Sequence, residues 1–399
     1  MLELDSKQTI KETIAPIPFR ILKCIGLWRP LTWSNWLKSL YTGFSVLTLI
    51  LLITITLTVL LGVYQMPMTD DLFAENVFLM FALINACFKA INVLSSRALF
   101  IEMITMIQHK RWLKLRNSEE EDIQDKYSKT IRKISIYFTT AVFIAIVLRC
   151  VAPLVDQTGQ KLLPVDAYCP CNVENPGCYW LLFWHQSFGT GIATLVHAAK
   201  DCLIIALLLQ TCAQLEILKY RLLSIADESK EAHAKNIKLD LIETLERESI
   251  ADCVQDHESV FKFSRILNKS LSVMLFGQIA VTIPNLCLSI FLLSTQHIAS
   301  VEFMMTMQFF SAVVIELFFF CWYGNEVTLT SLDVESAICE MEWEILANSS
   351  KKDLLYMMMR TSKPILFRVG PIMNMNIDSF LSIMKSSYSA FSVLQSTGA

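Results

Sequence analysis

Two stretches of this chain contain no Asp, Glu, Lys or Arg, and they constrain its fold more than any other feature. The first runs from Ser39 to Thr69 and the second from Ser270 to Val301. Because about 20 consecutive apolar residues span the roughly 30 Å hydrocarbon core of a bilayer, we expect both stretches to cross a membrane. Only 18% of the 399 residues are charged, below the ~25% of soluble domains. The sequence therefore predicts an all-α membrane protein and excludes one large soluble core.

Hydropathy predicts seven membrane-spanning helices, several of which contain isolated charges. Lys89 interrupts the second helix, Lys200 and Asp201 the fourth, and Glu316 the sixth. Ionisable groups inside a membrane face the bundle interior or a water-filled path. The seven helices are expected at about residues 40–63, 72–95, 131–155, 179–212, 268–294, 302–324 and 371–396.

The connections between these helices differ strongly in charge. Alternate segments together contain 28 Lys and Arg, whereas the remaining loops contain one. By the positive-inside rule, the N-terminus is cytoplasmic and seven crossings leave the C-terminus outside. This orientation argues against a G-protein-coupled receptor, whose seven helices run the other way. The basic segments are residues 1–38, 96–133, 213–269 and 324–367, and the others are 64–71, 156–178 and 295–301.

We therefore divide the chain into four parts. Residues 1–38 form a basic amphipathic leader whose tryptophans, beside Lys and Arg, suit the headgroup region of a membrane. Residues 39–324 contain the first six helices. Residues 325–367 form a helical cytoplasmic anchor, and residues 368–399 form the seventh helix.

The cytoplasmic anchor contains a short hydrophobic repeat. Val334, Ile338, Met341 and Ile345 are spaced 4, 3 and 4 residues apart, which is typical of a helix-pairing seam. One interpretation is a contact between subunits beneath the membrane. The other is packing against the cytoplasmic extensions of the chain's own fifth and sixth helices.

The seventh helix carries one polar stripe. Its polar residues recur at spacings of 4, 3, 4, 3 and 4, which places them on one helical face. The stripe is explained by a pore shared between subunits, by an interfacial amphipathic helix, or by burial against the other six helices. Its members are Asp378, Ser382, Lys385, Ser389, Ser392 and Ser396.

Three cysteines lie in the outer loop before the fourth helix. Cys169 and Cys171 are too close in sequence to pair readily with each other, so a disulfide from either of them to Cys178 is compatible with an oxidising exterior. We predict no enzyme, metal or cofactor, because the chain has no HExxH, P-loop or nucleophile elbow. His185 and His197 are twelve residues apart on one helix, too far to share a metal.

The last third of the chain contains an ordered series of short motifs. They are Cys321-Trp322-Tyr323-Gly324-Asn325-Glu326-Val327, Trp343, Lys352-Asp353-Leu354-Leu355, Met357-Met358-Met359-Arg360, Lys363-Pro364, Gly370 and Ser387-Tyr388-Ser389-Ala390-Phe391. In this order the motifs resemble the insect odorant receptor family. The resemblance implies an odorant-gated, non-selective cation channel, a tetramer with one central pore lined by the seventh helix.

In this family an odorant-specific tuning subunit assembles with a coreceptor subunit. The chain looks like a tuning subunit, because residues 213–269 lack the long insertion that the coreceptor carries there. The implied partners are a small volatile odorant, coreceptor subunits in a heterotetramer, the lipid bilayer, and monovalent and divalent cations, with no nucleic acid. The aromatic content of the chain suggests that the odorant is aromatic. The implied location is the plasma membrane of an olfactory sensory neuron dendrite.

The resemblance also implies two sets of site residues. The odorant pocket is expected among the second, third, fourth and sixth helices in the outer half of the membrane. An aromatic, apolar cavity with one or two polar groups suits a small volatile. The pocket residues are Phe78, Phe81, Phe143, Val147, Phe188, Met304 and Gln308, and the pore residues are Phe391, Ser392 and Gln395.

Three other classes remain as alternatives. A gustatory-type receptor channel shares this architecture but usually ends in a different seventh-helix motif. A G-protein-coupled receptor requires the opposite orientation. A transporter or membrane enzyme requires a convergent set of functional side chains that the sequence does not indicate.

Overall fold

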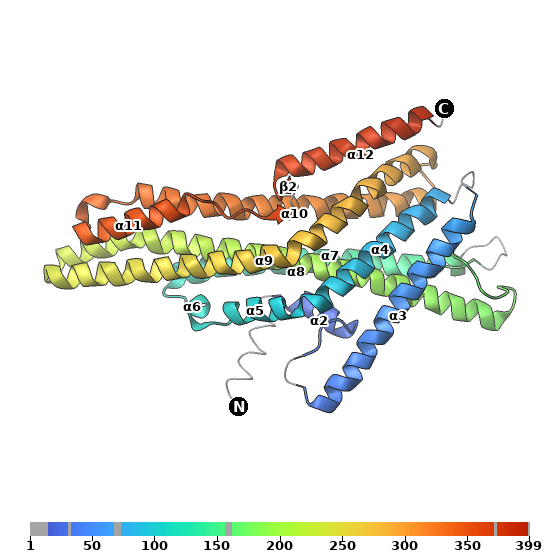
Figure 1. Cartoon of the computed structure of the whole chain (residues 1–399), viewed down its shortest axis with the longest axis horizontal. Helices are drawn as coiled ribbons and strands as arrows, with labels where there is room; N and C mark the ends of the chain where they lie inside the picture. The colour runs from blue at the N-terminus through green and yellow to red at the C-terminus, as the bar shows by residue number, and fades with distance from the viewer. Residues whose placement is uncertain (1–14, 31–32, 68–72, 156–161, 371–372, 398–399) are drawn as a thin grey trace.

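The computed structural model describes the chain except for residues 1–14, 31–32, 68–72, 156–161, 371–372 and 398–399. It is a bundle of long helices with one two-stranded antiparallel hairpin (Figure 1). The helices are α2 (Pro16–Cys24), α3 (Asn35–Gln65), α4 (Phe73–Ser95), α5 (Arg97–Ile107), α6 (Lys110–Leu113), α7 (Ser118–Val155), α8 (Pro176–Ala234), α9 (Leu239–Thr295), α10 (Val301–Glu340), the 3-10 helix η1 (Trp343–Ile345), α11 (Asn348–Thr361) and α12 (Ile377–Thr397), and the strands are β1 (Arg368–Val369) and β2 (Met373–Asn374).

Six of the described helices are long and apolar enough to cross a membrane, and they match the first six predicted spans. Several continue far beyond the span. α8 has 59 residues and α9 has 57, so the predicted cytoplasmic connections are largely helical extensions. The closing helix α12 has 21 residues but is not among the six, because its polar stripe lowers its mean hydropathy.

The central helix of the bundle is α8. From Ala198 to Ala213 every one of its residues is buried, and the helix contacts α2, α3, α4, α7, α9 and α10. A helix that is apolar on all sides is stable only where other elements surround it. The sequence Leu203 to Leu209, which has no polar residue, meets this condition.

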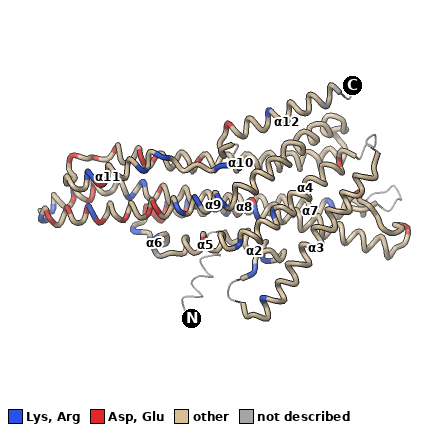
Figure 2. Tube along the Cα trace, in the orientation of Figure 1, with Lys and Arg blue, Asp and Glu red and all other residues tan. Residues whose placement is uncertain are grey.

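Charged residues separate the molecule into two regions (Figure 2). They concentrate over α11 and the adjoining parts of α8, α9 and α10, whereas the opposite part of the bundle is nearly free of them. The charge-poor part contains the apolar windows of the six spans. We call the charge-rich part the anchor region. It consists of α6, α11 and the adjoining ends of α7, α8, α9 and α10, and it includes the cytoplasmic anchor predicted at residues 325–367.

The hydrophobic repeat in the anchor region packs within the chain. Val334 and Ile338 are fully buried in the main core, and Met341 is 5% exposed. The predicted subunit contact is therefore wrong for these three residues, and the alternative of intrachain packing holds. Ile345 does not continue the repeat, because α10 ends at Glu340 and Ile345 lies in η1.

The hairpin β1–β2 connects the anchor region to α12. At Gly324 of α10 a Cβ atom would lie 2.6 Å from the Cβ of Met375 and 2.8 Å from its carbonyl oxygen. Such an approach excludes any side chain, so glycine is required there. The rings of Phe318 on α10 and Phe380 on α12 meet edge to face at 5.6 Å, which adds a second contact between these helices.

The outer loop is closed by a disulfide between Cys171 and Cys178. Of the two pairings left open by the sequence, the structure forms this one. Cys169 keeps a free thiol, which donates a hydrogen bond to the carbonyl oxygen of Ala167.

Candidate functional site

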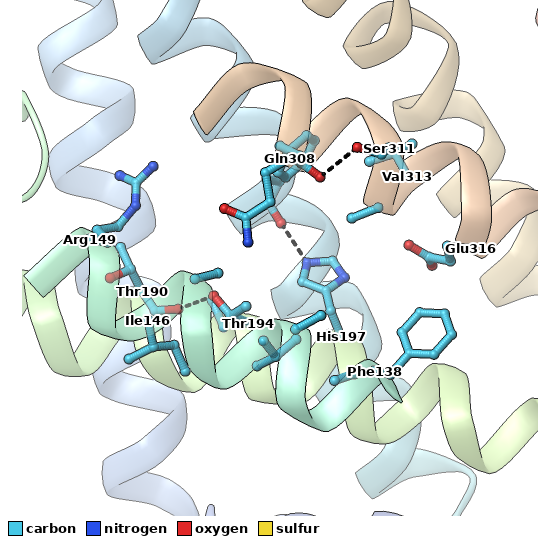
Figure 3. Close-up of a pocket in the computed structure, with 18 of the residues that line it drawn as sticks. Phe138, Ile146, Arg149, Thr190, Thr194, His197, Gln308, Ser311, Val313 and Glu316 are labelled. Atoms are coloured by element: carbon cyan, nitrogen blue, oxygen red, sulfur yellow. Dashed lines mark hydrogen bonds between the residues drawn. The ribbon is translucent and has the colours of Figure 1, made fainter. Parts of the chain in front are cut away.

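A cavity of about 340 Å³ lies among α4, α7, α8, α9 and α10. Ligand pockets for small molecules begin at roughly this size. Figure 3 shows Arg149 near one end of the pocket and Glu316 near the other, with Gln308 and His197 between them. Most of the wall is apolar, and its residues include Leu79, Leu83, Tyr137, Phe138, Val142, Ile146, Phe309 and Ile315.

The hydroxyl groups of the wall are occupied by the backbone of their own helices. Thr190 donates to the carbonyl oxygen of Gln186 at 2.8 Å, and Thr194 donates to that of Thr190 at 2.7 Å. Ser311 likewise donates to the carbonyl of Met307. Because these protons are engaged, the three hydroxyl groups do not donate to a ligand in the cavity.

His197 has a defined tautomer. Its Nε2 lies 3.1 Å from the carbonyl oxygen of Ala82, as Figure 3 shows. A carbonyl oxygen only accepts, so Nε2 carries the proton and donates. In the neutral ring Nδ1 is then an acceptor at the wall of the cavity.

Buried charges form the inner end of the cavity. Lys89 on α4 is fully buried and donates to both oxygens of Asp201 on α8, at 2.7 and 2.8 Å. It also donates to Oε1 of Glu316 on α10, at 2.6 Å. Gln278 on α9 donates to the same Oε1. This cluster joins four helices, and losing one of its charges would leave the others uncompensated in a medium of low dielectric.

The inner end does not suit a metal ion. Ligand atoms of His197, Asp201 and Glu316 all lie within 4.8 Å of one another, a grouping found in many metal sites. Here the ammonium of Lys89 contacts both carboxylates at 2.6 to 2.8 Å. It takes the position between them that a cation would need, so the cluster is an ion-pair network.

Known proteins show which family has this architecture. The profile of the family described as 7tm Odorant receptor matches residues 69–388. The chain belongs to the odorant receptor family. Its relatives include Odorant receptor 33a of Drosophila melanogaster, 25% identical over 280 residues that cover 69% of this chain and 71% of that one. Another is Odorant receptor Or1 of Anopheles gambiae, 19% identical over 94% of this chain and 93% of that one.

The fold agrees with the family. The olfactory receptor OR5 of Machilis hrabei, solved in complex with eugenol, superposes with a TM-score of 0.80 at 13% identity, covering 98% of this chain and 99% of that one. A second structure of the same receptor gives a TM-score of 0.81. Insect odorant receptors are odorant-gated cation channels. The predicted class is thereby confirmed: the chain is an odorant receptor with the seven-helix fold, a ligand-gated channel and not an enzyme.

Among the seven residues predicted for the odorant pocket, the cavity of this receptor is lined by Gln308 alone. Phe78 packs its ring against Phe309, a lining residue, at 4.1 Å, and Phe81 is half-buried nearby on α4. The other four lie on the outer surface of the bundle. They are Phe143, Val147, Phe188 and Met304.

Helical phase explains this difference. Val142, Ile146 and Met305 line the cavity, and each is one residue away from a predicted position. One residue turns a helix by about 100°, so the predicted positions on these helices face the outer surface of the bundle while their neighbours line the cavity. The charged inner end was not predicted as a site, although each of its charges interrupts an apolar span.

The predicted pore residues divide between two faces of α12. All six members of the polar stripe, Ser392 among them, are exposed, as is Gln395. Phe391 is 8% exposed and lies on the packed face together with Ile383 and Ser387. The polar stripe is thus not buried against the other helices of the same chain, which removes one of the three explanations.

Proposed function

We propose that this odorant receptor is the tuning subunit of a heteromeric cation channel and that its odorant binds in the cavity. The observation that carries the proposal is a mostly apolar cavity of about 340 Å³ between five helices of the bundle. A volatile with about ten heavy atoms needs roughly 0.8 kcal/mol per atom to bind at micromolar concentration. Contact on all sides supplies that, and a shallow groove does not.

The ligand class follows from the walls. Tyr137, Phe138 and Phe309 contribute aromatic surface, which favours an aromatic or heteroaromatic odorant through ring contacts. Phe78 supports this wall from behind.

The channel requires a water-filled path, and α12 supplies a surface for one. Its exposed stripe includes Asp378 and Lys385, which are costly to place against lipid. Four subunits that turn this face toward a common axis provide such a path, with Ser392 and Gln395 near its outer end. Coreceptor subunits complete the tetramer.

Gating follows from a difference in affinity. Odorant binding favours the conformation in which α12 moves away from the axis. The ligand shifts this equilibrium only by as much as it binds the open state more tightly.

The charge pattern sets the orientation. The segments expected in the cytoplasm contain 28 Lys and Arg, against one outside, so the anchor region is cytoplasmic and the C-terminus external. The Cys171–Cys178 disulfide then lies in the oxidising exterior. The location is the plasma membrane of an olfactory sensory neuron dendrite.

The test is to express the chain with an insect odorant coreceptor and to record membrane current during application of small volatiles, with G-protein signalling blocked. We expect a fast cation current that requires this chain. Current abolished by the block would contradict the channel.

Two variants test the pore. Ser392→Ala and Gln395→Ala should alter conductance, ion selectivity or sensitivity to pore blockers. Ser386→Ala, also exposed on α12 but outside the stripe, is the matched control. If Ser392→Ala and Gln395→Ala behave like the control, α12 does not line the pore.

A further inference from the structure

The free hydrogen-bonding atoms around the inner end of the cavity are acceptors. Glu316 receives two hydrogen bonds at Oε1, from Lys89 and Gln278, and no N–H of the described residues donates to its Oε2. Its side chain is 14% exposed, and it lines the cavity. The Nδ1 of His197 is a second acceptor, because Nε2 of the same ring donates to Ala82. The cavity thus presents lone pairs here rather than protons.

A third acceptor lies further along the wall. Asn285 is 4% exposed and lines the cavity, and its Oδ1 has no hydrogen-bond partner among the described residues. A buried acceptor without a partner has lost its hydrogen bonds to water, so a donor brought by a ligand is favourable at such positions.

Among the described residues, no second lysine or arginine forms an ion pair with Asp201 or Glu316. Lys89 already contacts three carboxylate oxygens. Lys200 adjoins Asp201 in sequence, but its Nζ lies 4.2 Å from the ring centroid of Phe100. Two carboxylates therefore share one ammonium, and this imbalance disfavours a ligand that presents a further acceptor.

We propose that the inner end of the cavity binds the hydroxyl or amino group of the ligand, so that this receptor selects small volatiles with a hydrogen-bond donor. His197 and Glu316 both line the cavity, and a ring nitrogen of His197 lies within 4.8 Å of a carboxylate oxygen of Glu316, so one hydroxyl or amino group can reach both side chains. The carbon skeleton of the ligand then extends along the apolar wall toward Gln308. This inference rests on the proposed odorant-binding function.

The length of the cavity fits such a ligand. Phe138 and Arg149 line it from α7 and are eleven residues apart, which corresponds to about 16 Å along the helix. A chain of six to eight heavy atoms fits within this length while its polar group stays beside Glu316.

The experiment uses two ligand series matched in heavy-atom number. The linear series is 1-hexanol, hexylamine, 1-methoxypentane and heptane, and the aromatic series is benzyl alcohol, benzylamine, anisole and ethylbenzene. Binding is measured as thermal stabilisation of the purified full-length complex with coreceptor, and activation is measured as current. We expect the alcohol or amine to bind at least about tenfold more tightly than the ether and the hydrocarbon, as for a hydrogen bond to a charged group.

Variants assign the preference to the inner end. Glu316→Gln preserves the shape but offers an amide N–H₂, so the advantage of the alcohol over the ether should fall about tenfold or reverse. His197→Leu should reduce it as well. Leu79→Ala, a lining residue of the apolar wall, is the matched control and should weaken all ligands alike.

The outcomes separate the two proposals. Donor-selective binding without current supports this inference and contradicts the channel function. Current in which alcohols and amines perform no better than ethers overturns this inference and leaves the channel intact. A series in which nothing binds better than heptane also overturns it. If Glu316→Gln lowers the yield of folded complex, His197→Leu is the deciding variant. A reduced advantage of the alcohol over the ether in that variant supports the proposal, and an unchanged advantage overturns it.

Discussion

Two buried clusters in this receptor each contain one basic and two acidic side chains, but their surroundings differ. In the membrane bundle, Lys89 lies between Asp201 and Glu316. In the anchor region, Arg221 lies between Glu120 and Asp256, at 2.7 Å from each. Each cluster places one base between two acids. They differ in how many lone pairs remain unused.

The anchor cluster is closed. Arg221 donates to both oxygens of Glu120 and to Asp256, and a backbone N–H of Arg116 and the side chain of Arg111 supply further donors to these acids. Burial tends to raise the pKa of Glu120, but the hydrogen bonds and charge of Arg221 outweigh it and lower the pKa. The membrane cluster has no second cation in contact and faces a cavity. A closed cluster holds helices together, whereas an open one can also bind.

The largest effect is expected from Lys89→Met. It leaves Asp201 and Glu316 without a cation inside the bundle, which costs about 3–5 kcal/mol. The measurement is the melting temperature of the purified complex together with its abundance at the cell surface.

The control for Lys89→Met removes all three charges, as Lys89→Met with Asp201→Asn and Glu316→Gln. Because no uncompensated charge remains, stability should return toward that of the unmodified receptor. If Lys89→Met alone is as stable as the unmodified chain, the cluster does not hold the four helices.

A smaller effect, about 2–3 kcal/mol, is expected from Arg221→Met. Arg111 and Arg116 remain to compensate part of the charge, and both are partly exposed. Arg221→Lys keeps the charge but loses the two-pronged contact with Glu120. Its stability should therefore lie between that of Arg221→Met and that of the unmodified receptor. Melting measurements in which Arg221→Met costs more than Lys89→Met would reverse the comparison.

The smallest effect concerns His257 on α9 in the anchor region. Burial, with the nearby charge of Arg360, lowers the pKa of His257 to about 4. Since the unfolded chain takes up this proton near pH 6.5, the folded state loses stability as the pH falls below that value. The loss reaches about 2 kcal/mol at pH 5 and levels off below pH 4.

His257→Gln should remove this part of the acid sensitivity. The difference in melting temperature between pH 7.5 and pH 5 is measured for both proteins. Both pH values lie above the range in which Glu120 takes up a proton, because its pKa is lowered. An unchanged difference would mean that water reaches His257 and that the anchor region is less dry than its packing indicates.

The spans and the helical character of the anchor region could be predicted because they depend on local composition. Two charge-free stretches predicted the span in α3 and the span in the second half of α9. The alternation of basic and uncharged segments predicted where the connections between spans lie. The fold class followed from these features, and the family followed from motifs between Cys321 and Phe391.

The cavity could be predicted less well, because it depends on helical phase and on contacts distant in sequence. Lys89 pairs with Asp201 across 112 residues and with Glu316 across 227. In the sequence each residue is only a lone interruption of its own helix. Phe143 was chosen for its depth and chemistry, but Val142 occupies the inward position. Rotation about a helix axis is set by packing partners that one sequence does not reveal.

The glycine at position 324 has a mechanical consequence. α10 contributes Glu316 to the cavity and, eight residues or about 12 Å further, meets Met375 at the base of α12 with no side chain between them. The backbone of α10 therefore lies directly against Met375, two residues before α12 begins, so a shift of α10 at this point would displace Met375. In the channel proposed above, this contact would transmit movement at the cavity to α12 without any contact between α12 and the ligand.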